Sequence, residues 1–419
     1  MGEGFVFLFV MDVNPVILAI PVFFILIGME VAYGYFKDRK IYRLNDAVTN
    51  ISCGIVEQLT GVFAKVFTVA AYAFIYENFR VFTLEDTWYW IVIAFIGVDF
   101  FYYWAHRMSH EVNLFWLGHV VHHQSEDYNL SVALRQSTFQ KMFTFYFYFP
   151  LAFLGFKTEW FLLMGAFNLL YQFWIHTEVI GKMPAWYEYV FNTPSHHRVH
   201  HGRNPKYIDR NHAGTLMIWD RMFGTYQREE ETPTYGITTP TNSWNPVTAN
   251  VQPFVRLWRE LKAIPGFVNK VKFTFAPPGW YPKEMGGFQK PKEVDKRAYS
   301  KYEIQISPSL NYYLFAQYLT TLGFTALFLF NLTEFSLFYQ LAIAAVIIYS
   351  VASLGTLFDD RPYGIKMEGL RFFITIGIAL FLYLQGMLPL WIPIALVVIS
   401  SISAVVIFRL SFHNIERVK

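Results

Sequence analysis

The chain has 419 residues, of which 54% are hydrophobic, 20% aromatic and only 16% charged. Soluble domains usually carry about 25% charged residues, so this composition favours a protein whose solvent is lipid. The net charge of +3 is too small to indicate a nucleic-acid partner, and the single cysteine, Cys53, excludes an internal disulfide framework and a thiolate metal cluster.

Nine apolar stretches of the chain approach the length that a membrane-spanning helix requires, which is ~20 residues. They lie near residues 15–36, 55–76, 88–104, 142–156, 160–175, 312–330, 337–357, 370–385 and 388–410. The fourth stretch is short and is separated from the fifth only by residues 157–159, so these two can form a hairpin that does not fully cross. We therefore expect an all-α, polytopic membrane helical bundle of about nine hydrophobic helices.

The basic residues favour one orientation of this bundle. They gather after the first helix, in the polar stretch 177–309 and at two later alternate turns, whereas the opposite side carries only Arg80 and Lys157. This pattern predicts an N-terminus outside and a C-terminus in the cytosol. It also predicts three parts: N-terminal membrane helices (1–176), a cytosolic helical cap (177–309) and C-terminal membrane helices (310–419).

Histidines are concentrated in one part of the chain, because eleven of the twelve fall between His106 and His212. Their spacing is regular: a pair four residues apart is followed by two triplets at i, i+3 and i+4. These are His106 and His110, then His119, His122 and His123, then His197, His200 and His201. Residues three and four apart share a helix face, so each cluster can aim its imidazoles at one point. Eight imidazoles exceed what one tetrahedral site uses, so the pattern favours a dinuclear metal site.

His176 is a ninth candidate ligand. It follows the fifth stretch, and Asn168 and Gln172 precede it on the same face at intervals of four. His196 and His212 stay open, and His413 is not expected to take part. All three clusters fall on the predicted cytosolic side, which Lys and Arg define independently. Histidine alone leaves zinc, copper and iron open, although the H-E-x-x-H pattern of zinc proteases is absent from the sequence.

Two carboxylates near the first histidine pair are candidate catalytic residues. Glu111 follows His110 directly, so it can orient a ligand or pass a proton, or it can be a solvated charge at a helix end. Asp99 precedes His106 by seven residues and therefore shares its helix face about two turns away. A carboxylate at that depth is costly unless paired, and metal-bound histidines often hydrogen-bond to carboxylates, so Asp99 can support a ligand or brace the helix.

The three clusters, HRMSH (106–110), HVVHH (119–123) and HRVHH (197–201), resemble the eight-histidine signature of the fatty acid hydroxylase and sterol desaturase superfamily. The flanking segments 99–107 and 211–226 agree with that superfamily. Within it, the chain is similar to the alkylglycerol monooxygenase subgroup. The similar segments are HEVNLFW (110–116), HHQSEDYNLSVALRQS (122–137), TPSHHRVHHGRN (193–204) and PPGWYPKEMGGF (277–288). His212 departs from the pattern, because relatives commonly carry Tyr or Phe there.

The resemblance implies an integral membrane enzyme with two iron ions that uses O2 to hydroxylate a lipid C–H bond, and redox-inert zinc does not suit that reaction. It further implies that the substrate is an alkylglycerol, hydroxylated next to the ether oxygen and then split into a fatty aldehyde and glycerol, with tetrahydrobiopterin as reductant. Residues 125–129 and Arg135 are candidates to hold the glycerol end or a pterin, or they form a solvated loop. The enzyme would lie in the endoplasmic reticulum of a eukaryote or the inner membrane of a bacterium.

Two alternatives remain open at this point. A sterol desaturase or another lipid hydroxylase of the same superfamily would hold the same metals but act on a different lipid, with cytochrome b5 or ferredoxin as an electron donor protein. A metal transporter would carry ions across the bilayer, but its sites are expected near the membrane midplane rather than gathered at one face.

Overall fold

The computed structural model describes residues 15–295 and 297–416, in which the regular elements are helical apart from one isolated bridge between Phe191 and Leu216. The expectation of an all-α fold is confirmed for these residues. They divide into two compact units. Unit 1 takes its residues from Met1–Arg43, Glu57–Thr241 and Asn250–Lys301, and unit 2 from Leu44–Val56, Asn242–Ala249 and Tyr302–Lys419. The three-part division at residues 176 and 309 stays a prediction.

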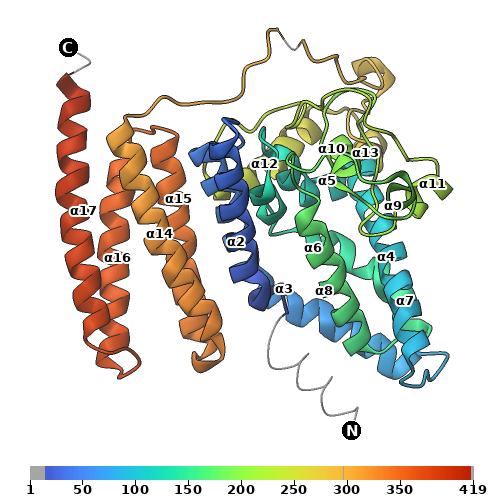
Figure 1. Ribbon diagram of the computed structural model, residues 1–419, viewed down its shortest axis with the longest axis horizontal. Helices are drawn as coiled ribbons and strands as arrows, with labels where there is room; N and C mark the ends of the chain where they lie inside the picture. The colour runs from blue at the N-terminus through green and yellow to red at the C-terminus, as the bar shows by residue number, and fades with distance from the viewer. Residues whose placement is uncertain (1–14, 296, 417–419) are drawn as a thin grey trace. The chain divides into compact units, whose positions relative to one another are not determined.

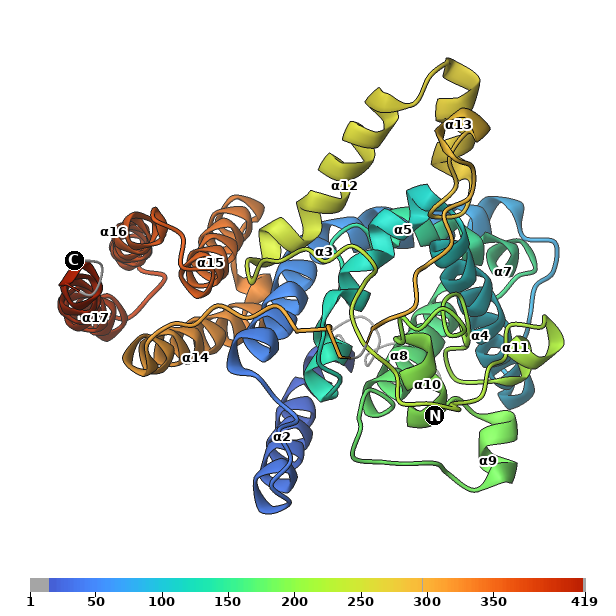
Figure 2. The ribbon, with the colours of Figure 1, turned by 90° about the horizontal axis from the view of Figure 1, so that it is seen from above.

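Unit 1 contains the histidine-rich part of the chain (Figures 1 and 2). Its longer helices are α2 (Pro15–Phe36), the second half of α3 (Leu44–Phe79), α4 (Trp88–Glu111), α8 (Thr158–Trp174), most of α12 (Pro246–Ala263) and α13 (Phe267–Phe275). Its short α-helices are α5 (Asn113–His119), α6 (Gln140–Thr144), α7 (Phe149–Phe153), α9 (Ala185–Val190), α10 (Pro194–His200) and α11 (Ile218–Met222). The 3-10 turns η1 (Val120–Gln124), η2 (Leu130–Leu134), η3 (Phe145–Tyr148) and η4 (Lys283–Met285) complete it.

Unit 2 is built on α14 (Pro308–Phe330), α15 (Leu337–Phe358), α16 (Gly364–Leu384) and α17 (Trp391–Glu416), with the 3-10 turn η5 (Leu332–Glu334) between the first two. These helices follow one another in an up-and-down order in Figure 1. Arg371 and Glu368 of α16 form a buried ion pair inside the unit, with N–O distances of 2.6 and 2.9 Å. Tyr313 donates to Glu368 and Gln317 accepts from Arg371, both from α14, so these four buried polar side chains satisfy one another.

The number of hydrophobic helices differs from the expectation of about nine. In the described residues, five helices are long and apolar enough to cross a membrane, namely Leu18–Phe36, Trp88–Glu111, Pro308–Phe330, Leu337–Phe358 and Gly364–Leu384. A sixth is obtained if Leu44–Gly61 and Val66–Phe79, which meet at an angle of 52°, count as one broken span. Their outer faces are apolar, as Ile25 and Met29 of α2 illustrate, because each is 62% exposed. An exposed apolar face of this kind is typical of helices surrounded by lipid.

The predicted fourth span does not form a continuous helix. Its residues are divided among α6, η3 and α7, which have 5, 4 and 5 residues. Pro150 lies in the first turn of α7, where its missing N–H is tolerated, and it would disrupt the interior of a longer helix. The fifth predicted span is α8, with 17 residues, and the last apolar segment, Trp391–Ile407, is also shorter than the other spans.

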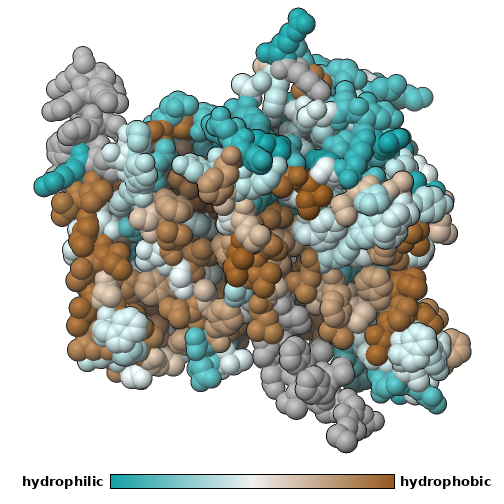
Figure 3. All heavy atoms as spheres, in the orientation of Figure 1, coloured by the Kyte–Doolittle hydropathy of each residue, from teal (hydrophilic) through white to brown (hydrophobic). Residues whose placement is uncertain are grey.

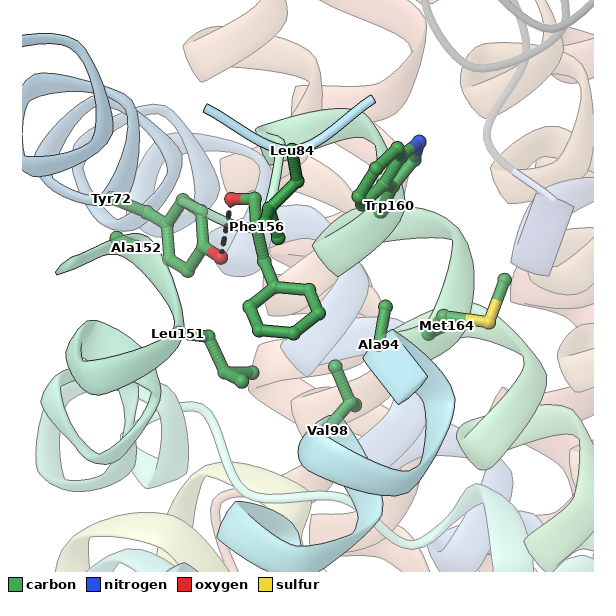
Figure 4. Close-up of a cluster of buried hydrophobic side chains, with 9 residues drawn as sticks. All are labelled: Tyr72, Leu84, Ala94, Val98, Leu151, Ala152, Phe156, Trp160 and Met164. Atoms are coloured by element: carbon green, nitrogen blue, oxygen red, sulfur yellow. Dashed lines mark hydrogen bonds between the residues drawn. The ribbon is translucent and has the colours of Figure 1, made fainter. Parts of the chain in front are cut away.

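A cluster of buried apolar side chains fixes the membrane helices of unit 1 beneath the histidines. Figure 4 shows that it joins α3, α4, α7 and α8. Tyr72 donates from its hydroxyl to the carbonyl of Phe156 at 3.0 Å, which ties α3 to the start of α8. Gly97 permits close packing of α4 on α7, because a Cβ atom there would lie 2.8 Å from Leu151 Cδ2. These contacts hold α4 and α8 in a fixed relation, and both helices lead into histidines.

Hydropathy changes along unit 1. On the face shown in Figure 3, hydrophobic side chains cover the lengths of the helices, and hydrophilic side chains gather over the loops at the top right of the view. Those loops connect α9, α10, α11 and α13 (Figure 1). An apolar girdle with polar loops at its end is the arrangement expected of an integral membrane protein.

Candidate metal centre

Nine buried histidines form two groups at one place in unit 1. The first histidine group consists of His106, His110, His119, His123 and His200, and the second consists of His122, His176, His197 and His201. Within each group, one ring nitrogen of every member lies within 4.8 Å of those of all the others. The two groups are adjacent, because the ring centroids of His123 and His201 are 4.4 Å apart. The structure therefore brings together the nine histidines that the sequence singled out.

The triplets do not each aim at a single point, which differs from the expectation. Histidines four residues apart share a group: His106 with His110, His119 with His123, and His197 with His201. The third member of each triplet belongs to the other group. The first triplet crosses from the end of α5 into the 3-10 turn η1, whereas His197 and His200 of the second triplet both lie on α10. Both triplets therefore contribute to both groups and hold them together.

Backbone carbonyls fix four of the rings. Nδ1 of His106 lies 2.8 Å from the carbonyl oxygen of His212, and Nδ1 of His122 lies 2.9 Å from that of Arg135. Nδ1 of His176 lies 2.7 Å from the oxygen of Gln172, and Nδ1 of His200 lies 2.9 Å from that of Arg210. A carbonyl oxygen only accepts, so Nδ1 carries the proton and Nε2 presents its lone pair. This is the orientation that metal-binding imidazoles adopt.

The lone pairs face one another without a proton to share. Nε2 of His122 lies 3.2 Å from Nε2 of His176, although the Nδ1 atom of each ring already holds the proton of the neutral form. Nε2 of His110, His200 and His201 is buried without a hydrogen-bond partner. Two acceptors held this close repel each other unless a cation lies between them. Two nitrogens bound at a right angle to one ion, each about 2.1 Å away, would be about 3.0 Å apart, so the residues present fit metal ions.

The electrostatics of the groups favour neutral imidazoles. Burial lowers the pKa of His122 to about 4, and it holds the pKa of His123, His200 and His201 well below the ordinary value of 6.5. Neighbouring imidazoles add to the effect, because a second positive charge nearby disfavours protonation. Metal ions bind only the deprotonated ring, so the groups are ready to bind at neutral pH.

Asp99 lies below the first group and does not belong to it. Its carboxylate is fully buried and accepts hydrogen bonds from the backbone N–H groups of Thr215 and Leu216 at 2.7 and 3.0 Å, from Trp219 Nε1 at 2.9 Å and from Asn168 at 2.5 Å. These donors hold the loop 211–219 on α4. Gly214 of that loop fits because a Cβ atom there would lie 2.6 Å from Asn168 Oδ1. Asp99 therefore fixes the loop whose carbonyl orients His106.

Asp220 holds the same loop from its other end. It accepts from the backbone N–H groups of His212 and Ala213, each at 2.8 Å, and from the hydroxyl of Thr225 at 2.6 Å. Burial raises its pKa to about 6. Its position eight residues after His212 is no recognisable ligand spacing, so the spacing alone does not connect Asp220 with the histidines.

Glu111 lies at the end of α4, beside the first group. Its Oε1 accepts from Arg107 Nε at 2.9 Å, and Nη1 of Arg107 also contacts the hydroxyl of Tyr103 at 3.1 Å. The Glu111 side chain is 30% exposed, so water reaches the carboxylate. It is not a member of either histidine group.

His212 and His196 are placed differently. The ring of His212 is fully buried, with its centroid 5.1 Å from that of His110 and 5.7 Å from that of His200, so it borders the first group. His196 is also buried, but it packs against Tyr226, with ring centroids 5.5 Å apart, and lies outside both groups. The side chain of His413 is outside the part of the chain whose side chains the structure describes.

The loop after the first triplet is held in place by ion pairs and hydrogen bonds. Asp127 pairs with Arg43 at 2.9 Å and with Lys301 at 2.5 Å, and Arg135 donates to the carbonyl of Val121 at 2.7 Å and to Gln124 at 2.8 Å. Arg135 thus braces η1 while its own carbonyl orients His122. The loop 125–129 is buried rather than solvated, which corrects that alternative.

Tyr128 is a neighbour of the second group that the sequence did not reveal. Its buried ring stacks on His176 and on Tyr235, with centroid distances of 5.8 and 4.8 Å, and its hydroxyl donates to the carbonyl of Ile175 at 3.0 Å. Burial holds the pKa of Tyr128 well above 10. A single tyrosine forms no ligand pattern in the sequence, so only the packing shows that Tyr128 lies beside the second group.

Comparison with known proteins agrees with this geometry. The family model described as fatty acid hydroxylase matches residues 91–225, which contain all nine grouped histidines. Alkylglycerol monooxygenase from Xenopus tropicalis is 42% identical over 373 residues, which cover 87% of this chain and 80% of the relative. The human enzyme of the same name is 40% identical over 376 residues (88% and 84%), and the Danio rerio enzyme is 37% identical over 391 residues (92% and 87%). No solved structure matches the chain. The resemblance seen in the sequence is confirmed, and the chain belongs to the alkylglycerol monooxygenase family.

Proposed function

We propose that this protein is a membrane monooxygenase that uses O2 to cleave the ether bond of alkylglycerols, with one metal ion held by each of the two histidine groups. The observation that carries the proposal is the convergence of ring nitrogens from nine buried histidines in two adjacent groups, in which backbone carbonyls on Nδ1 leave Nε2 of four rings free. Membership of the alkylglycerol monooxygenase family over most of the chain supports the reaction.

The metal in this proposal is iron. An all-imidazole site accepts zinc, copper or iron, but attack on an unactivated C–H bond needs a redox-active ion. When bound, the two irons supply the activation of O2 that no side chain can provide. The ligands are His106, His110, His119, His123 and His200 for one ion and His122, His176, His197 and His201 for the other.

The overall reaction balances with two electrons and two protons. One oxygen atom of O2 becomes a hydroxyl on the carbon next to the ether oxygen, and the other leaves as water. The resulting hemiacetal breaks its C–O bond to release a fatty aldehyde and glycerol. Tetrahydrobiopterin is the proposed reductant. An electron donor protein would replace it if the reaction proves independent of pterin.

The protein's own residues supply binding, orientation and protection from water. All nine rings are buried, so the site is closed to bulk solvent that would quench a reactive oxidant. Carbonyls at residues 135, 172, 210 and 212 fix the protonated Nδ1 atoms, which keeps Nε2 free. We assign proton delivery to Glu111, because it follows a ligand and its carboxylate is reached by water. Asp99 acts as a positioning residue through the loop that it holds.

We place the site on the cytosolic side of the membrane. Basic residues concentrate in the segments beside the histidines, which is the distribution expected of cytosolic loops. The protein would then lie in the endoplasmic reticulum of a eukaryote or in the inner membrane of a bacterium.

The test is metal analysis of the purified protein in detergent, followed by an alkylglycerol assay with and without tetrahydrobiopterin. We expect about two irons per chain and fatty aldehyde that depends on pterin. Two irons without aldehyde would keep the oxygenase but require another lipid, such as a sterol. Stoichiometric zinc after expression in iron-replete medium, with no activity, would contradict the proposal.

A further inference from the structure

Two amphipathic helices of unit 1 expose apolar side chains that the proposed reaction does not use. On α12, Val251, Val255 and Trp258 are exposed, and their spacing of four and three places them on one face. On α13, Phe267, Val271 and Phe275 are exposed at intervals of four, with Val268 beside them. Phe267 is 80% exposed and Trp258 is 61% exposed, which is unusual for large apolar side chains in water.

Each helix has a second apolar face that is buried, so the exposed faces are not unpacked core. Leu257 of α12, Ile264 directly after that helix and Phe273 of α13 form a cluster with Leu117 of α5. This packing holds the two helices against the element that ends in His119. The remaining apolar faces of α12 and α13 point away from that cluster, as their spacing requires.

Basic side chains flank the exposed faces. Between residues 251 and 275 there are five basic side chains, Arg256, Arg259, Lys262, Lys270 and Lys272, and one acidic side chain, Glu260. Glu260 is paired with Arg256 at 3.1 Å. Lys270 and Lys272 lie on either side of the apolar face of α13, and Lys262 Nζ lies 5.1 Å from the Trp258 ring centroid. Apolar residues bordered by cations are typical of helices that lie in the plane of an anionic lipid surface.

The end of α13 is attached at the level where a membrane span ends. The backbone N–H of Asn113 donates to the carbonyl of Ala276 at 2.9 Å, and the side chain of Asn113 donates to the carbonyl of Phe273 at 3.3 Å. Asn113 is two residues beyond α4, which is a span ending at Glu111. The end of α13 is therefore attached at the histidine end of this candidate span, and Figure 2 shows α12 and α13 on the outer side of α5 in the view from above.

We propose that α12 and α13 form an interfacial surface that inserts Trp258, Phe267, Val268, Val271 and Phe275 among anionic phospholipids, while Arg259, Lys262, Lys270 and Lys272 contact their phosphates. This surface is a second membrane contact besides the spanning helices. It is independent of the reaction proposed for the histidine groups, because it rests on residues outside them.

The experiment uses the full chain in phospholipid nanodiscs. Cys53 is buried, so a cysteine introduced at an exposed position can be labelled with the environment-sensitive dye NBD. Val268→Cys and Phe267→Cys report on the proposed surface, and Glu230→Cys, at a position that is also exposed, is the matched control. Nitroxide-labelled phosphatidylcholine in the nanodisc quenches a dye that lies among lipids. We expect at least two-fold stronger quenching at residues 267 and 268 than at residue 230.

The charge requirement is tested by lipid composition. Quenching at residue 268 should rise when 30% of the phosphatidylcholine is replaced by phosphatidylglycerol. It should fall again in a Lys270→Glu, Lys272→Glu background but not in a Lys290→Glu, Lys292→Glu background. Equal quenching at residues 268 and 230 would overturn the membrane contact. A dye shielded from water but unquenched would overturn it too, since a protein partner would then cover the surface. Quenching that ignores phosphatidylglycerol would overturn the preference for anionic lipid.

Discussion

The carbonyl oxygen of His212 lies 2.8 Å from Nδ1 of His106 and fixes which nitrogen of that ring is free. Residue 212 is far from residue 106 in the chain, and two buried carboxylates hold its loop in place. Asp99 accepts from the backbone at residues 215 and 216, and Asp220 accepts from that at residues 212 and 213. The first histidine group thus depends on carboxylates that touch none of its members.

Asp99→Asn should weaken metal binding without removing a ligand. The amide NH2 would face at least one of the four donors that now point at the carboxylate, so the loop 211–219 would move and the carbonyl of His212 would leave His106. Loss of such an outer partner typically costs ~10–100-fold in metal affinity. Competition with a chelator measures the affinity. Asp86→Asn, at an exposed carboxylate paired with Lys157, is the control and should bind iron like the wild type. Equal affinity in both variants would show that Asp99 only packs the helix.

His122→Ala and His200→Ala should each abolish activity and lower the iron content. His122 belongs to the second group and His200 to the first, so under the proposed assignment each variant removes one ligand from a different ion. His196→Ala is the matched control, because that ring is also buried but lies outside both groups. Iron analysis by mass spectrometry checks all three variants. A His122→Ala protein with full iron content would contradict the ligand assignment.

The metal-free protein should lose stability as the pH falls. In the folded chain burial lowers the pKa of His122 to about 4, whereas an unfolded imidazole titrates near 6.5. Between these values the unfolded state binds more protons than the folded state. The contribution of His122 to the free energy of unfolding is therefore fully present above pH 6.5 and decreases as the pH falls towards 4. Thermal unfolding of chelator-treated protein in detergent at pH 7.5 and 5.5 measures this. A melting temperature that is unchanged or higher at pH 5.5 would be inconsistent with the buried neutral rings.

Arg371→Met should strongly destabilise unit 2. The substitution leaves Glu368 without its cation among the apolar helices α14 to α16, and breaking a buried pair typically costs about 3–5 kcal/mol. Changing Glu368→Gln in the same protein removes the orphaned charge and should recover much of the loss. Unfolding by sodium dodecyl sulfate gives the free energies for a double-mutant cycle.

The control for that cycle is an exposed ion pair. Arg256→Met breaks the pair with Glu260 on α12, and surface pairs are worth about 0–1 kcal/mol. A single Arg371→Met variant as stable as Arg256→Met would mean that lipid or water satisfies Glu368 and that the pair is unimportant.

The sequence by itself determined the fold class, the lipid environment and the family, because these depend on features that are local in the chain. Hydrophobic runs mark helices in lipid wherever they pack, and i, i+4 histidines share a face of any helix. The count of spans was less well determined. The aromatic segment 142–156 is as apolar as a membrane span. In the structure, however, it is divided among the short helices α6, η3 and α7, and Pro150 lies in the first turn of α7.

Only the tertiary structure decided how the histidines divide between two groups and what fixes their rings. His122 and His123 are adjacent in sequence but belong to different groups, because successive side chains of a helical turn point in different directions and each meets histidines from other elements, His176 for His122 and His200 for His123. Tautomers depend on carbonyls at residues 135, 172, 210 and 212, and a carbonyl belongs to every residue alike. The sequence therefore does not distinguish the carbonyls that orient the rings, and only the folded chain shows which ones do.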